Sequence, residues 1–219
     1  MSTADPPGRA RPHHPRIALR LALLYVGLIL FGVGIALLIL GDIGVPPWDV
    51  FHTGFSDATG WPLGPVIIGV SVAVLLLWIP LGERPGLGTV SNAILVGATI
   101  DVAGRLFPDT PDSMAVRIVL MVAGIVVNGI ATGMYIGARF GPGPRDGLMT
   151  GIAKRRWSVR SVRTAIEVVV LVAGVALGGS VGVGTVAYAL AIGPIAHYTI
   201  PYFSRLTETA PAGRARAAG

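Results

Sequence analysis

Long apolar runs, interrupted twice by a segment rich in glycine, proline and aspartate, are the feature that most restricts how this chain can fold. The runs reach about 18 residues or more, the length at which a helix can cross the hydrocarbon layer of a bilayer. The chain of 219 residues is 53% hydrophobic and only 13% charged, whereas a soluble domain carries about 25% charged residues. We therefore predict an all-α, polytopic membrane protein without a separate soluble domain.

Six segments have the length and composition of transmembrane helices. They cover residues 17–40, 63–81, 89–107, 114–136, 159–178 and 184–202. Residues 1–16 lack apolar periodicity and are predicted to be a disordered tail, and residues 204–219 are predicted to be a second polar tail. The connections 41–62 and 137–158 are longer than a turn requires, and each has room for a short helix.

The two halves of the chain repeat one another. A shift of 97 residues aligns segment 44–54 with segment 141–151, and a shift of 96 aligns segment 86–90 with segment 182–186. Chance rarely gives a shared Pro-x-Asp-x-x-x-Thr-Gly pattern flanked by matching glycines. Residues 17–107 and 114–203 are thus predicted to be two units of three spans each. An odd number of spans makes the second unit enter the membrane from the opposite side, which gives an inverted repeat.

Positive charges predict the orientation. With a cytoplasmic N-terminus, only Arg105 and Arg117 of the 17 lysines and arginines fall on the outer side. Cytoplasmic loops carry the excess of positive charge, so both termini are predicted to be cytoplasmic. The net charge of +6 is explained in the same way, and nucleic acid is not expected as a partner because no basic helix or aromatic-basic platform is present.

Asp49 and Asp146 occupy the same position in the two copies of the repeated motif. Each lies two residues after a proline, and proline followed by an acid is typical of the first turn of a helix. Two interpretations remain open. The motifs are either broken or re-entrant helices that line a substrate cavity, or short helices at the membrane interface.

Polar residues inside the predicted spans are candidates for a solute or ion path, because such groups usually face the protein interior or water. Glu167 lies well inside its span, although it could also pair with Arg163 on the helix surface. Asp101 and His197 match one another in the repeat, and each also has a structural explanation, an ion pair with Arg105 or an interfacial hydrogen bond. The remaining candidates, which could equally be interhelical hydrogen bonds, are Asn92 and Asn128.

Signs of catalysis are weak. The chain has no cysteine, which excludes thiol chemistry and disulfides. Paired acids, metal-ligand spacings and phosphate-binding loops are also missing from the sequence. We therefore expect no enzyme activity, no catalytic residue, no cofactor and no metal site.

The motifs at residues 41–51, 86–89 and 139–147 give the chain a family resemblance. Over residues 17–203 it resembles the YczE-like bacterial inner-membrane proteins, which are related to the YitT group. The resemblance implies a small multi-pass protein of the bacterial cytoplasmic membrane. It implies no substrate.

The leading hypothesis from the sequence is a transporter or permease for a small solute, with Glu167 as the acid that couples a proton or cation. The inverted repeat favours it by analogy of fold. The alternative is a membrane scaffold that binds a partner without transport, because few polar residues line the spans. In either case the lipid bilayer is the solvent, and the sequence leaves the oligomeric state open.

Overall fold

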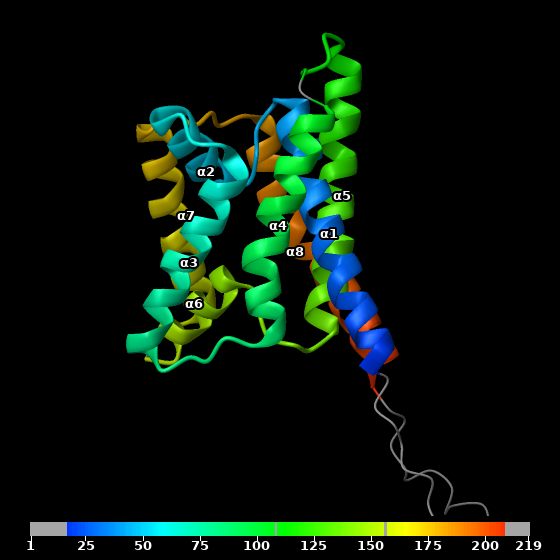
Figure 1. Cartoon of the computed structure of the whole chain (residues 1–219), viewed down its shortest axis with the longest axis vertical. Coiled ribbons are helices and arrows are strands. Elements are labelled where there is room, and N and C mark those ends of the chain that lie inside the picture. The colour runs from blue at the N-terminus through cyan, green and yellow to red at the C-terminus, as the bar shows by residue number, and fades with distance from the viewer. Residues whose placement is uncertain (1–16, 108, 156, 209–219) are drawn as a thin grey trace, which may run out of the picture.

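The computed structural model describes residues 17–107, 109–155 and 157–208. The described residues form eight helices (Figure 1), namely α1 (Ile17–Gly41), α2 (Pro47–Thr59), α3 (Leu63–Leu81), α4 (Leu87–Leu106), α5 (Met114–Gly137), α6 (Pro144–Ala153), α7 (Val159–Ala176) and α8 (Val183–Thr207). The predicted tail 1–16 lies outside the described residues. Helix α8 ends later than predicted, and the hydroxyl of Thr207 donates to the carbonyl of Gly137 at 2.9 Å, which joins this last turn to α5.

The prediction of an all-helical membrane protein is confirmed. Helices α1, α3, α4, α5 and α8 are long and apolar enough to cross a membrane. The sixth predicted span, α7, has 18 residues and carries Arg160, Arg163 and Glu167, so its length and composition alone do not mark it as a span. Helices α2 and α6 occupy the two long connections, where the sequence left room for short helices.

The helices pack in two groups. In the first, here called the α1/α5 group, α1 and α5 pack along each other, with α4 against α1 and α8 against α5. In the second, the α2/α7 group, α2 packs on α7 and α3 on α6, around a core of buried side chains that includes Trp78 and Leu148. Figure 1 shows the groups side by side. Each predicted unit contributes two helices to each group, so the packing groups cut across the units.

Glycines allow α1 and α5 to approach at backbone distance. A Cβ added at Gly124 would lie 2.7 Å from the carbonyl oxygen of Gly34, and one added at Gly27 would lie 2.9 Å from the amide nitrogen of Tyr135. Small residues at helix crossings in a membrane permit such contacts, because van der Waals packing replaces the hydrophobic driving force there. Gly27 and Gly124 are equivalent in the 97-residue alignment, so both glycines serve the same crossing.

After α1 and after α5 the backbone turns through left-handed conformations and leaves its helix. Asp42 and Gly44 have φ angles of 46° and 119°, and the equivalent residues Arg139 and Gly141 have φ angles of 59° and 116°. The angles at Gly44 and Gly141 are ones that side chains with a Cβ rarely adopt. The chain therefore enters α2 and α6 after a sharp break, and carbonyl groups at the end of each long helix are freed.

Groups from the second half of the chain bind the carbonyls freed after α1. The guanidinium of Arg117 donates to the carbonyls of Gly41, at 2.7 Å, and of Asp42. The amide of Gly184 donates to the carbonyl of Ile43 at 2.7 Å. Because the last carbonyls of a helix lack a partner within it, these bonds stabilise the break.

The carbonyls freed after α5 are bound in the same way by the first half. Arg20 donates to the carbonyls of Ala138, at 2.9 Å, and Arg139, at 3.0 Å. The amide of Gly88 donates to the carbonyl of Phe140 at 2.9 Å. Every donor and acceptor here is the counterpart, at a shift of 96 or 97 residues, of one in the preceding set.

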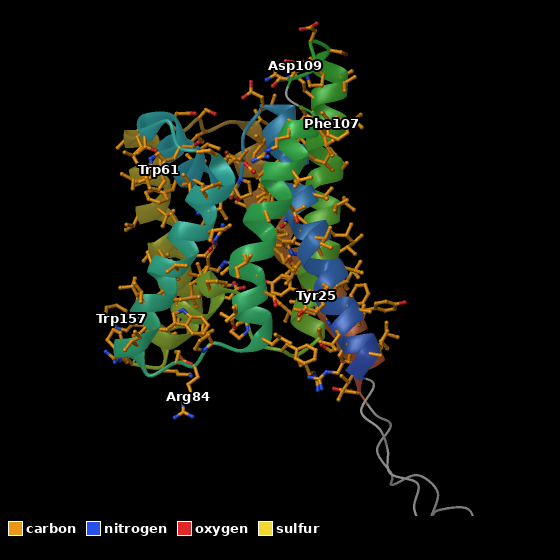
Figure 2. All side chains as sticks on the ribbon, in the orientation of Figure 1. Tyr25, Trp61, Arg84, Phe107, Asp109 and Trp157 are labelled. Atoms are coloured by element: carbon orange, nitrogen blue, oxygen red, sulfur yellow. The ribbon has the colours of Figure 1, made fainter. Side chains whose placement is uncertain are left out.

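The outer surface suits lipid. Val168, Val169, Val172 and Val175 of α7 are each at least 50% exposed, and a bundle in water would bury most of them. Figure 2 shows Trp61 at one end of the bundle and Trp157 at the other. Tryptophan is enriched at the two membrane interfaces, so these residues fit the boundaries of a lipid-embedded body.

The α1/α5 crossing predicts that Gly124→Ala lowers stability, because the new Cβ would meet the Gly34 carbonyl at 2.7 Å. Overpacking of this kind costs about 1–3 kcal/mol. Thermal unfolding of the purified protein in detergent measures the effect. The control is Gly69→Ala on α3, where an added Cβ meets nothing within 4 Å. Equal unfolding temperatures for the two variants would contradict the packing described for α1 and α5.

Candidate functional site

A cavity of about 180 Å³ lies between the two helix groups. Each of the eight helices contributes to its wall, and the first turns of α2 and α6 both face it. Each of these turns begins with a proline at the first helical position, where the missing N–H needs no partner. The cavity thus brings the starts of the two short helices to one place.

The first turn of α2 carries a buried pair of polar side chains. Asp49 and His52 are 2% and 0% exposed, and Nδ1 of His52 lies 3.0 Å from Oδ1 of Asp49. One helical turn separates them, which places both on one face of α2. Their burial makes this the most enclosed polar pair among the described residues.

Arg145 of α6 joins this pair across the junction of the two short helices. Its Nη2 lies 3.7 Å from Oδ1 of Asp49, and its Cζ lies 5.1 Å from the centre of the Trp48 ring. A guanidinium over an indole face is a favourable cation–π arrangement. Arg145 therefore links the start of α6 to the start of α2.

Three buried polar atoms at the start of α2 have no hydrogen-bond partner among the described residues. They are Nε1 of Trp48, Oδ2 of Asp49 and Nε2 of His52. Buried polar atoms are almost always paired in proteins, so a cluster of unpaired ones needs an explanation. Trp48 lines the cavity and is only 7% exposed, so one side chain of the cavity wall carries an unpaired indole N–H.

The first turn of α6 carries Asp146, which lines the cavity. The hydroxyl of Tyr135 donates to Oδ2 of Asp146 at 2.9 Å. A Cβ added at Gly143 would lie 3.3 Å from this Oδ2 and 3.5 Å from both the amide nitrogen of Asn92 and the hydroxyl of Tyr135. Asp146, Tyr135 and Asn92 thus converge on the bare backbone of Gly143. Trp78 Nε1 donates to the Pro144 carbonyl at 3.0 Å, which holds the start of α6 against α3.

Helix α7 adds an ion pair to the wall. Nε of Arg163 lies 2.9 Å from Oε1 of Glu167, and both residues line the cavity. The side chain of Glu167 is 30% exposed. Glu167 thus forms the pair with Arg163 that was the alternative explanation, and this pair lies in the cavity wall. Its role in a solute or ion path stays a prediction.

Asn128 is fully buried behind the cavity wall. Its amide donates to the carbonyl of Phe31 at 3.1 Å, and its Oδ1 accepts from the Tyr188 hydroxyl at 2.6 Å. Tyr188 in turn lines the cavity. Asn128 thus joins α1, α5 and α8 in one hydrogen-bonded set behind the wall.

Two sequence candidates lie outside the cavity. Asp101 pairs with Arg105 at 2.7 Å, which is the structural alternative that the sequence offered. His197 is exposed on α8 and contacts the ring of Tyr198 edge-on. The structure therefore brings five of the candidates to the cavity or its surroundings, namely Glu167, Asp49, Asp146, Asn92 and Asn128.

Sequence analysis did not select Arg145, His52 or Tyr135. Arg145 replaces Trp48, and His52 replaces Met149, at equivalent places in the two motifs. Self-comparison favours identical residues and passes over positions where the copies differ. The three-residue spacing of Asp49 and His52 was the available signal for that pair. Among the described residues no group of three or more His, Asp or Glu side chains could hold a metal ion.

The fold and cavity define a multi-pass α-helical membrane protein with a small polar site between two helix groups. The chain belongs to the family of unknown function DUF6198, whose model matches residues 18–201. The resemblance to YczE-like membrane proteins is confirmed, since the chain is 32% identical to the uncharacterised membrane protein YczE of Bacillus subtilis over 92% of this chain and 94% of that one.

Other relatives are equally without an assigned activity. An uncharacterised protein of Haemophilus influenzae is 34% identical over 85% of each chain. The uncharacterised protein YyaS of Bacillus subtilis is 26% identical over 82% of this chain and 92% of its own. No solved structure matches the chain.

The hydrogen bond between Asn128 and Tyr188 predicts that the two residues are energetically coupled. Asn128→Leu leaves the Tyr188 hydroxyl without its acceptor and removes the added bond to the Phe31 carbonyl, at a cost of about 1–3 kcal/mol. Tyr188→Phe made in that background should then cost less than it does alone, with a coupling energy of about 0.6 kcal/mol. Unfolding of the single and double variants in detergent gives this energy. Strictly additive losses would argue against the bond.

Proposed function

We propose that this protein is a transporter for a small solute and that the cavity between the two helix groups is its solute site. The supporting observation is that α2 and α6, one from each half of the chain, begin at the same cavity. In secondary transporters, interrupted helices from two related halves form the substrate site in this way. The cavity also holds charged groups of both signs, including Arg145 and Asp146.

We further propose that the halves are an inverted repeat with six spans, α7 included. The reciprocal bonds made by Arg20 and Arg117, and by Gly88 and Gly184, support this. So does the position of the equivalent residues Trp61 and Trp157 at opposite ends (Figure 2). The distribution of lysine and arginine supports the proposal that both termini lie on the cytoplasmic side of the bacterial cytoplasmic membrane.

The bodies that move in this proposal are the two helix groups. Each group holds equivalent helices from both halves, so a rocking motion of one group against the other can exchange the roles of the two ends. The cavity lies at their interface and remains in place. Glu167, whose carboxylate faces the cavity beside Arg163, is the residue to which we assign coupling of a proton or cation.

One pair of equivalent helix contacts is unequal. Helix α3 packs on α4, where a Cβ added at Gly97 would lie 2.7 Å from the carbonyl of Gly64. The counterpart of Gly97 is Gly193 on α8, and a Cβ there meets nothing within 4 Å. Gly193 lines the cavity together with Glu167 of α7. The contact between α3 and α4 at Gly97 is therefore closed, and the space at the equivalent residue, Gly193 of α8, is open. This difference supports the proposal, because one state of an alternating cycle closes one of two equivalent contacts and opens the other.

This asymmetry predicts that Gly193→Val traps one state. Ser71 of α3 lines the cavity, and the chain has no cysteine of its own. Ser71→Cys should therefore react with a charged, membrane-impermeant methanethiosulfonate from both sides of oriented vesicles. Adding Gly193→Val fills the space into which α7 must close, and reaction from one side should fall at least tenfold while reaction from the other persists.

The controls are Gly69→Val, a glycine on α3 with nothing within 4 Å, and Val74→Cys, a buried position on the same helix outside the cavity wall. The first should leave both reactions intact, and the second should stay unreactive. A scaffold is expected to let the thiol introduced by Ser71→Cys react from one side of the membrane only, with or without Gly193→Val. That result would rule out alternating access.

A further inference from the structure

We infer that the cavity binds a small zwitterion that carries an acid group and an ammonium group, as an amino acid does. The acid group binds at Arg145 and the indole N–H of Trp48, and the ammonium group binds at Asp146. The inference rests on the proposed function in one respect, that the cavity is the solute site. It adds the chemical class of the solute and the residues that recognise each end.

The acid end is assigned from one donor that lacks an acceptor and one whose acceptor is distant. Trp48 Nε1 is buried and without a partner among the described residues, and its side chain lines the cavity. The guanidinium of Arg145 lies over the same indole, and its ion pair with Asp49 is long, at 3.7 Å. An indole N–H and a guanidinium can only donate. A solute that satisfies both must therefore present oxygen acceptors, and an ionised acid gives the stronger, charge-assisted bonds.

The ammonium end is assigned from an acceptor with spare capacity. Two carboxylate oxygens can accept about four hydrogen bonds, and the bond from Tyr135 uses one of these places on Asp146. Asp146 is half-buried in the cavity wall. Asn92 lies on the same side, close to the backbone of Gly143. This end offers a negative charge and further polar groups to a cation with several N–H donors.

The site presents charges of both signs to a solute. The wall carries Arg145, Arg163, Asp146 and Glu167, and Asp49 lies 3.7 Å from Arg145 behind the wall. A zwitterion can place its negative group at a cation and its positive group at an acid, so it meets both signs within one site. The volume of about 180 Å³ restricts the solute to a small molecule.

Binding to the purified protein tests this inference. The probes are the individual proteinogenic L-amino acids, followed, for the one that stabilises most, by the amine without its carboxylate and the acid without its amino group. Thermal unfolding in detergent is the first measurement, and calorimetric titration gives the dissociation constants. We expect at least one amino acid to bind, and both half-molecules to bind at least tenfold more weakly. The inference is wrong if no amino acid binds or if either half-molecule binds as tightly as the whole.

Variants separate the two ends of the solute. Arg145→Gln should weaken the amino acid at least tenfold and leave binding of the amine half-molecule unchanged, and Asp146→Asn should spare the acid half-molecule instead. Gly143→Ala adds a methyl at ordinary distances from Asn92 and Tyr135 and 3.3 Å from Oδ2 of Asp146, which must shift by a few tenths of an ångström. This variant folds and weakens binding even if the charge variants do not fold. Its control, Gly69→Ala, should bind normally. Normal binding in Gly143→Ala would place the solute elsewhere.

The binding result and the transport result can fail separately. If Ser71→Cys reacts from both sides but no amino acid binds, the protein alternates and the zwitterion is excluded. If an amino acid binds with the expected dependence on Arg145 and Asp146 but the cavity reacts from one side only, the site is established and transport is excluded.

Discussion

The need to satisfy the backbone carbonyls at two helix ends governs this structure. Helices α1 and α5 end in left-handed residues, and the last carbonyls of a helix have no partner within it. Arg117 and Arg20 bind those carbonyls from the opposite half of the chain, and the amides of Gly184 and Gly88 do the same. The donors that complete each break therefore belong to the other half of the chain.

This mutual dependence explains the position of the polar site. Each break directs the following short helix inward, so α2 and α6 begin at one cavity. There the two motifs differ, with tryptophan in one and arginine at the equivalent place in the other, and Arg145 stacks on Trp48. The repeated residues build the frame and supply Asp49 and Asp146, and residues that differ between the copies, Trp48 and Arg145, complete the polar site.

The sequence predicted the helices well because the signals for them are local. Apolar runs set the spans, and proline with aspartate marked the starts at Pro47 and Pro144. The two packing groups were not predicted, because apolar periodicity does not say which helix is a neighbour. Arg145 and His52 were passed over for a similar reason. Their roles depend on contacts with Asp49 across one helical turn and across the junction, and a search for matching residues favours the positions that are the same in both copies.

The most direct test of the mutual dependence is the thermal unfolding of Arg20→Gln and Arg117→Gln in detergent, compared with Arg84→Gln, whose side chain is exposed at the end of the bundle (Figure 2). Hydrogen bonds to charged groups contribute about 1.5–3 kcal/mol, so each of the first two variants should unfold at a clearly lower temperature and by a similar amount. Arg84→Gln should unfold like the unchanged protein. Unfolding of Arg20→Gln or Arg117→Gln at the temperature of Arg84→Gln would contradict the claim that each half completes the backbone of the other.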